Sequence, residues 1–166
     1  MKSISLPSIV RANRVISRLA LSLAAALTLP GTASAATVSP TSYQFALKGS
    51  GNLVQGSSIW ACGWTLQAQS TSSSGGSMSG GVGDTNTNCN QLSVAATTWS
   101  VTSATTGVFN GLTITGGGIY CSTSASVPFT IMKSGNRVTS FFFNSVNFAG
   151  CNYNANLSTV AALNVT

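Results

Sequence analysis

The chain has 166 residues, and its ionisable side chains are few: seven Lys or Arg, one acidic residue and no His. A Ser-His-Asp triad and the paired carboxylates of glycoside hydrolases are therefore excluded, and metal sites built on His or carboxylate ligands are nearly excluded. We expect a protein that is not an enzyme and that uses no metal or cofactor.

The N-terminal stretch has the three parts of a secretory signal peptide. Residues 19–29 are apolar, and residues 33–35 read Ala-Ser-Ala, which fits a cleavage site. The basic residues that precede the apolar part are Lys2, Arg11, Arg14 and Arg18. We expect cleavage after residue 35, leaving residues 36–166 as one exported domain in the extracellular space, at the cell surface or in the periplasm, without a stable membrane anchor. The alternative is an uncleaved N-terminal anchor.

Cleavage would leave a nearly uncharged protein, with a formal net charge of +2 carried by Lys48, Lys133, Arg137 and Asp84. No basic patch is left to neutralise phosphates, which excludes nucleic-acid binding. A Ser- and Thr-rich surface also lacks the Lys side chains that keep sheet edges apart. Such a surface would tolerate self-association, or contact with hydrophobic small molecules and interfaces.

Four cysteines in an exported chain predict two disulfides, with three possible connectivities. Pairing in sequence order, Cys62 with Cys89 and Cys121 with Cys151, closes loops of similar length. A zinc site made of all four thiolates is disfavoured because such sites need closely spaced cysteine pairs.

The first half of the exported part predicts two strands and a loop. Residues 38–48 alternate apolar and polar side chains and lead into a turn at residues 49–51. Residues 58–69 place Trp60, Cys62 and Trp64 on one face. Residues 70–88 are rich in Gly and Ser, which predicts a mobile loop or a weak edge ribbon.

Strand patterns continue to the C-terminus. Residues 91–103 and 107–115 are strand-like, residues 116–118 form a turn, and Pro128 marks an edge or a bulge in the strand that follows. Residues 138–151 contain four Phe on both parities, which favours a central strand covered on both sides. A turn at residues 152–156 precedes a last alternating strand at 157–165. The sequence therefore predicts an all-β fold, a small antiparallel β-sandwich or barrel-like domain.

Three tryptophans, Trp60, Trp64 and Trp99, are the candidate ligand-facing aromatics, as a platform for sugars or alkyl chains. Core packing is the favoured alternative, because two of them share a face with a cysteine. Asp84 and the asparagines after it resemble the start of a calcium loop, but Cys89 and Ala95 occupy positions that need Gly and Glu. Two interpretations of this segment remain: a weak cation site at Asp84, or an Asx-rich turn, which is the ordinary one.

Several features together resemble the secreted bacterial family called protein activator of alkane oxidation. They are Val38-Ser39-Pro40 followed by Tyr43 and Phe45, the strand of Cys62, Val127-Pro128-Phe129, the aromatic strand that ends at Cys151, and the closing apolar strand. Phe129 departs from the Trp expected there. The resemblance implies an exported protein that aids hydrocarbon emulsification or uptake, and it implies no catalytic residues.

The first functional hypothesis is accordingly a secreted, non-enzymatic accessory protein that acts at apolar substrates or interfaces. The second is a structural or adhesive surface subunit, pilin-like or a matrix fibre, because unguarded terminal strands and low charge suit strand addition between chains. The third is a carbohydrate-binding module that uses the tryptophans.

Overall fold

The computed structural model describes residues 35–83 and 88–166. The chain divides into two units, Met1–Ala33 and Ser34–Thr166. The first unit, with nearly all of the predicted signal peptide, lies outside the described residues, and so does Asp84 with the start of the predicted cation site. The described part of the second unit contains β-strands joined by turns and short irregular segments.

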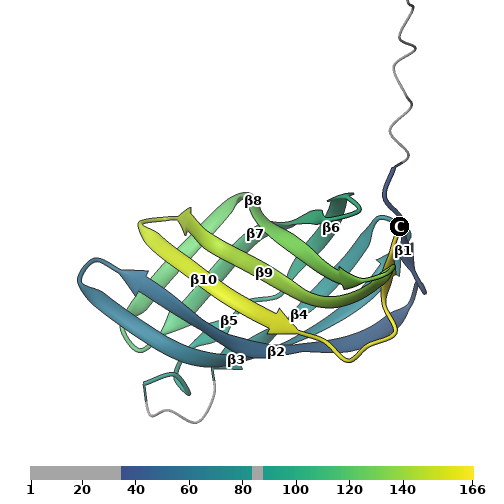
Figure 1. Ribbon diagram of the computed structural model, residues 1–166. Helices are drawn as coiled ribbons and strands as arrows, with labels where there is room; N and C mark the ends of the chain where they lie inside the picture. Colours follow the sequence, from purple (N-terminus) through teal and green to yellow (C-terminus); the bar gives the residue numbers. More distant parts are fainter. Residues whose placement is uncertain (1–34, 84–87) are drawn as a thin grey trace, which may run out of the picture. The chain divides into compact units, whose positions relative to one another are not determined.

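The described strands follow one another in an up-and-down order (Figure 1). In chain order they are β1 (Val38–Ser39), β2 (Tyr43–Gln55), β3 (Ser58–Ser72), β4 (Gly75–Gly83), β5 (Ser93–Val94), β6 (Thr97–Ser103), β7 (Thr106–Gly116), β8 (Ile119–Ser134), β9 (Arg137–Phe148), β10 (Cys151–Ser158) and β11 (Asn164–Val165).

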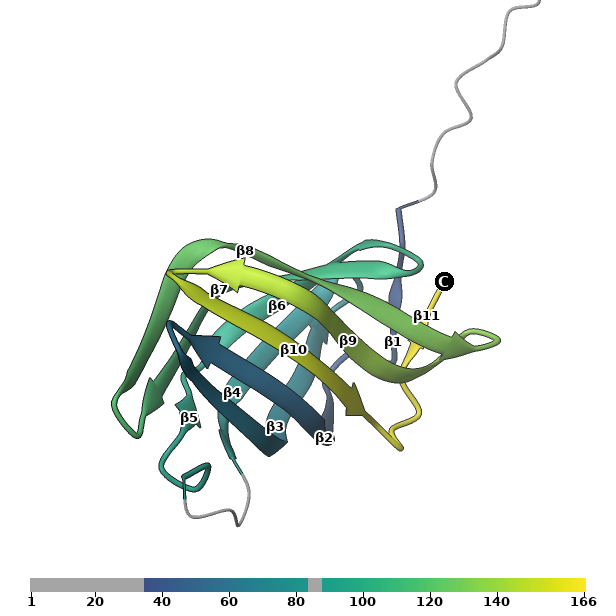
Figure 2. The ribbon, with the colours of Figure 1, turned by 60° about the vertical axis from the view of Figure 1, so that its left-hand side comes forward.

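The long strands close into an antiparallel barrel (Figure 2). Around the barrel, each strand from β2 to β9 pairs with the strand that follows it in the chain, apart from β5 and β6. These two short strands both lie between β4 and β7, and each pairs with both of them. The ring closes where β10 pairs with β2, from Cys151 opposite Gln55 to Ser158 opposite Lys48. The predicted all-β, barrel-like fold is confirmed, and the interior of such a barrel is just wide enough for side chains to fill.

Two predicted turns are wrong, and at the first of them the glycines allow close strand approach. Gly49 and Gly51 lie inside β2, where β10 runs so near that a side chain at Gly49 would overlap the carbonyl oxygen of Asn156. The second predicted turn, residues 152–156, lies inside β10. Glycine in a strand marks a place where another backbone approaches closely, so the β2–β10 closure depends on these residues.

The Gly- and Ser-rich stretch is a central strand, and the predicted loop or edge ribbon is wrong over Gly75–Gly83. This segment is β4, which pairs with β3 on one side and with β5 and β6 on the other. A Cβ atom at Gly76 would overlap the carbonyl oxygen of Gln69 on β3. The many glycines of β4 allow its backbone to pack closely against the neighbouring strands.

The Phe-rich strand β9 has only one buried face in the described structure, so the prediction of cover on both sides is wrong. Phe141, Phe143 and Phe148 all point into the barrel, although they do not share one parity. Register shifts occur on both sides of β9, and Ser145 has a positive φ of 50°. Such bulges move a strand by one residue and re-aim its side chains, while Phe142 stays half-buried on the outer wall.

The β8–β9 seam is the least paired part of the barrel. β8 pairs with β9 over Thr130–Ser134, whereas Ile119–Phe129 pairs with β7 alone among the described strands. Figure 2 shows β8 bending away from β9 toward its start. Pro128 lies in this part, as its predicted edge position requires. The disulfide between Cys121 and Cys151 joins the start of β8 to the start of β10 across the seam.

The terminal strands are paired with each other. Val38 of β1 lies opposite Val165 of β11, and the amide of Val38 donates a hydrogen bond to the carbonyl of Ser73 at 2.7 Å. β11 in turn pairs with β9 at Asn164 opposite Arg137. Strand addition at either end of the described domain would therefore have to displace existing partners.

An aromatic cluster fills the barrel. Phe141 lies at its centre, with ring-centroid distances of 4.6 Å to Phe129 and 5.8 Å to Trp99. The cluster continues through Phe143, whose ring lies 5.2 Å from that of Tyr153. The core is thus made by side chains from strands all around the ring, and the functional surface must be sought on the outer wall and the barrel ends.

Candidate functional site

Two of the three predicted ligand-facing tryptophans lie inside the barrel. Trp64 on β3 and Trp99 on β6 are 1% and 2% exposed. Their rings make edge contacts with Tyr153 and Phe45, at centroid distances of 5.6 and 6.1 Å. Trp60 is half-buried against the core near the start of β3. A ligand on the surface therefore has access to Trp60 alone of the three.

The buried polar groups of this core offer no acid–base chemistry near neutral pH. The indole N–H groups of Trp64 and Trp99 have no hydrogen-bond partner among the described residues, and each unsatisfied donor costs about 1–3 kcal/mol. Burial raises the pKa of the Tyr153 phenol well above its ordinary value, because the charged phenolate would lose its hydration. Tyr153 thus stays neutral and contributes to packing.

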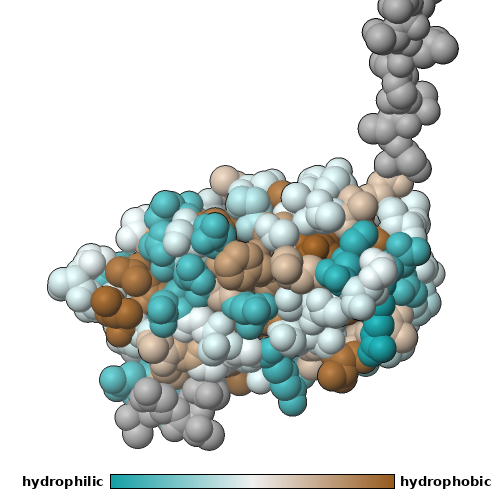
Figure 3. All heavy atoms as spheres, in the orientation of Figure 1, coloured by the Kyte–Doolittle hydropathy of each residue, from teal (hydrophilic) through white to brown (hydrophobic). Residues whose placement is uncertain are grey.

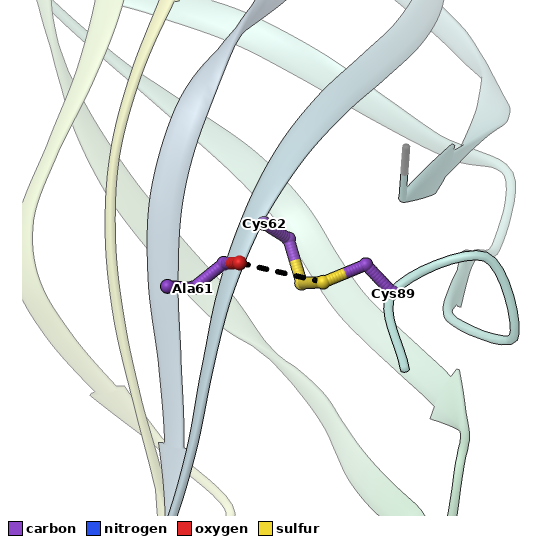
Figure 4. The surroundings of a disulfide bond; sticks show 3 residues. All are labelled: Ala61, Cys62 and Cys89. Carbon is purple, nitrogen blue, oxygen red and sulfur yellow. Dashed lines mark hydrogen bonds between the residues drawn. A yellow bond between two sulfur atoms is a disulfide. The ribbon is translucent and has the colours of Figure 1, made fainter. Parts of the chain in front are cut away.

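The four cysteines form two disulfides, as predicted, and of the three possible connectivities the structure has the sequential one, Cys62–Cys89 and Cys121–Cys151. Figure 4 shows the first, which ties β3 to the loop before β5. A sulfur of this disulfide, Sγ of Cys89, lies 3.5 Å from the carbonyl oxygen of Ala61. Because a disulfide sulfur carries no proton, we treat this approach as a contact. Both bonds hold the barrel together and leave no free thiol.

Three cationic side chains occur in the described residues, and they differ in how they are used. Lys133 Nζ donates to the carbonyl of Val165 at 3.0 Å. Arg137 donates from Nη2 to the carbonyl of Val160 at 2.8 Å and from Nε to that of Ala161 at 3.3 Å. The ammonium group of the exposed Lys48 makes no hydrogen bond or ion pair within the described residues.

A groove lies beside the unpaired Lys48, where the start of β2 faces the segment after β10. Its volume is about 450 Å³, which is within the range of small-molecule sites, about 300–1,000 Å³. We call it the Val160 groove, and it is lined by Tyr43, Gln44, Phe45, Ala46, Lys48, Ser158, Thr159, Val160 and Ala161. The lining combines apolar side chains with one cation and several hydroxyl and amide groups.

The segment that forms one side of the groove is fixed by hydrogen bonds. The amide of Thr159 donates to the carbonyl of Thr139 at 2.9 Å, and its side-chain oxygen accepts from the amide of Ala161 at 3.1 Å. Arg137 binds the carbonyls of the next two residues, as above. Val160 is nevertheless 94% exposed. The side chain of Val160 is therefore exposed to water, although hydrogen bonds fix the backbone that carries it.

Other exposed apolar side chains are scattered over the wall. Ile59 and Tyr120 lie at the tips of two hairpins, which a hydrogen bond from Gln55 Nε2 to the carbonyl of Tyr120 joins at 3.2 Å. Val82 and Met132 are exposed on β4 and β8. Figure 3 shows apolar patches over the β2–β3 tip and over the segment after β10, with a mixture of polar and apolar residues between them. Of these patches, the one at Val160 adjoins a groove.

A shallower groove of about 260 Å³ lies on the outer wall of β6 to β9. Val108, Pro128 and Phe142 are among its lining residues, and no charged side chain lines it. It extends the apolar surface and offers little to orient a ligand.

No group of three or more His, Cys, Asp or Glu that could hold a metal ion occurs within residues 35–83 and 88–166. Within the same ranges, the structure contains no helix that is long and apolar enough to cross a membrane. The groove itself supplies apolar contact, one positive charge and hydrogen-bonding groups. This arrangement suits non-covalent binding.

Sequence reasoning missed Val160 and Arg137 as parts of a site. One signal was present: residues 157–165 alternate, and Val160 is the largest apolar residue on the parity of Ser158, Ala162 and Asn164, which faces outward. The pairing of Arg137 with this segment had no local signal, because the two are more than 20 residues apart.

The fold and the groove together define a disulfide-bonded, all-β barrel protein with an apolar surface site that carries one free cation among the described residues. Comparisons of the chain with protein-family models, curated proteins and solved structures gave no match. The resemblance to the activators of alkane oxidation stays an expectation.

Proposed function

We propose that the protein is a secreted, non-enzymatic accessory protein that binds apolar material through the Val160 groove. It acts at the boundary between water and hydrocarbon and aids emulsification or uptake of the hydrocarbon. The observation that carries the proposal is a valine, 94% exposed, on a fixed segment beside an apolar groove. A groove of this size that combines apolar lining with a few polar groups is the usual form of a ligand site, and the family resemblance supports hydrocarbon as the partner.

The energetics favour adsorption of this face. Full burial of a valine side chain stabilises by about 1.5–3 kcal/mol, and the groove lining adds further apolar area. Desolvation of charged groups opposes adsorption, and two charges lie at this face: Lys48 of the groove and the exposed Arg137, which donates to the carbonyl of Val160. The fixed backbone at Thr159 and Ala161 also lowers the ordering entropy lost on contact.

The variant Val160→Asp tests the proposal. Wild-type protein is expected to lower the tension of a hexadecane–water interface, and V160D is expected to lose about half of this effect or more, because a carboxylate at the contact must be desolvated. The measurement is pendant-drop tension at equal protein concentration, with droplet stability as a second readout.

Val82→Asp is the matched control, since Val82 is exposed on β4 and does not line the groove. V82D should act like the wild type. A wild-type protein no more surface-active than lysozyme, or equal losses in V160D and V82D, would overturn the proposal. Measuring the size of the protein under the same conditions distinguishes adsorption of single molecules from self-association. The edge available for self-association is the uncharged part of β8 that does not pair with β9.

A further inference from the structure

The lining of the Val160 groove carries one positive charge, that of Lys48, with which a pure hydrocarbon cannot interact favourably. Lys48 lies on β2 opposite Ser158 of β10, and it lines the groove together with Ala46 and Val160. A neutral alkane would gain nothing from the ammonium group. A ligand with an apolar chain and an anionic head would use both parts of the lining.

The other two described cations are already engaged by the backbone around the C-terminal segment. Lys133 binds a carbonyl of β11, and Arg137 binds the carbonyls of Val160 and Ala161. Lys48 has no such partner in the described residues, and none of the described residues carries a carboxylate side chain. An anion at Lys48 would therefore meet no acidic side chain of the described groove.

We propose that the Val160 groove binds a single-chain amphiphile with a carboxylate head. The carboxylate pairs with Lys48 Nζ, and the alkyl chain lies against the apolar lining around Phe45 and Val160. The groove of about 450 Å³ suits one chain better than the two chains of a bilayer lipid. This inference rests on the proposed function and names the ligand class of the same site.

Charge complementarity favours an anionic head group. Lys presents a compact point charge with three donors, which a single carboxylate can neutralise. The hydroxyl groups of Ser158 and Tyr43, both groove-lining residues, are available as further donors to a carboxylate oxygen. Because Lys48 is exposed, its contribution is modest and should weaken with salt.

The experiment is calorimetric titration of the purified protein with decanoate, decanol and decyltrimethylammonium below their micellar concentrations. Decanoate should bind most tightly, and Lys48→Gln should weaken it roughly threefold to fivefold. Lys48→Arg should restore most of the affinity. Lys133→Gln, which removes the same charge outside the groove, should leave decanoate binding unchanged. Vesicles of phosphatidylglycerol should bind more weakly than free decanoate.

The outcomes separate this inference from the proposed function. Equal affinity for decanoate and decanol, with no effect of K48Q, would remove the carboxylate assignment and leave apolar binding in place. Preference for vesicles over decanoate would replace the free amphiphile by a membrane surface. Failure of all three amphiphiles to bind would overturn the inference, while the interfacial tension of V160D decides the proposed function independently. Thermal unfolding of each variant checks that the fold is intact.

Discussion

Reducing both disulfides is expected to lower the free energy of unfolding by roughly 7 kcal/mol, about 3.5 kcal/mol for each bond on the chain-entropy estimate. The two bonds close loops with sequence separations of 27 and 30 residues. Small domains are stable by only about 5–15 kcal/mol. The reduced protein should therefore be unfolded, or close to it, at growth temperatures.

Denaturant unfolding with and without a reducing agent measures this loss. The four cysteines of the chain are all in the two disulfides, so the reagent has no other thiol or disulfide to act on. Paired Cys→Ser variants separate the bonds. Loss of Cys121–Cys151 should also raise hydrogen exchange at the start of β8, where this bond bridges the seam. A change below about 1 kcal/mol for both bonds together would show that strand pairing alone holds the barrel closed.

Phe141→Ala is expected to cost about 3–5 kcal/mol, the range for deletion of a buried aromatic ring. Phe141 is fully buried, and its ring contacts those of Phe45, Phe129 and Trp99. Removing it leaves a cavity at the centre of an aromatic cluster whose other members lie on β2, β3, β6, β7, β8 and β10 as well as on β9, so relaxation around the gap should be limited.

Phe142→Ala provides a control of the same residue type at the next position. Phe142 is half-buried on the outer wall and lines the shallow groove of β6 to β9, so its loss should cost about 1 kcal/mol. Chemical denaturation of both variants gives the comparison. Similar losses for the two variants would mean that β9 is covered on both faces, as its sequence pattern suggested.

The alternation of apolar side chains and the cysteine order were sufficient to predict an all-β fold with two disulfides. Local patterns could not distinguish a barrel from a sandwich, because closure depends on the register of β10 against β2, which are about 100 residues apart. The glycines of β2 and β4 resembled turn and loop signals, since a glycine required by close strand approach looks the same in sequence. The bulges of β9 likewise have no clear signature.

The candidate site was harder to predict than the fold. The tryptophans drew attention as aromatic side chains near a cysteine, yet Trp64 and Trp99 are buried in the barrel. The groove is made by residues 43–48 and 158–161, which meet only when the ring closes. Its exposed Val160 is fixed by Arg137, a contact between segments that no local pattern connects.

Covalent labelling of side chains by hydroxyl radicals, read by mass spectrometry, compares the protein free in solution with the protein adsorbed on hexadecane droplets. Binding through the Val160 groove predicts that Val160 and Tyr43 are labelled less on the droplets, while Ile59 and Tyr120, at the hairpin tips, are labelled as in solution. Protection of Ile59 and Tyr120 with Val160 unchanged, or no protection anywhere, would contradict the account.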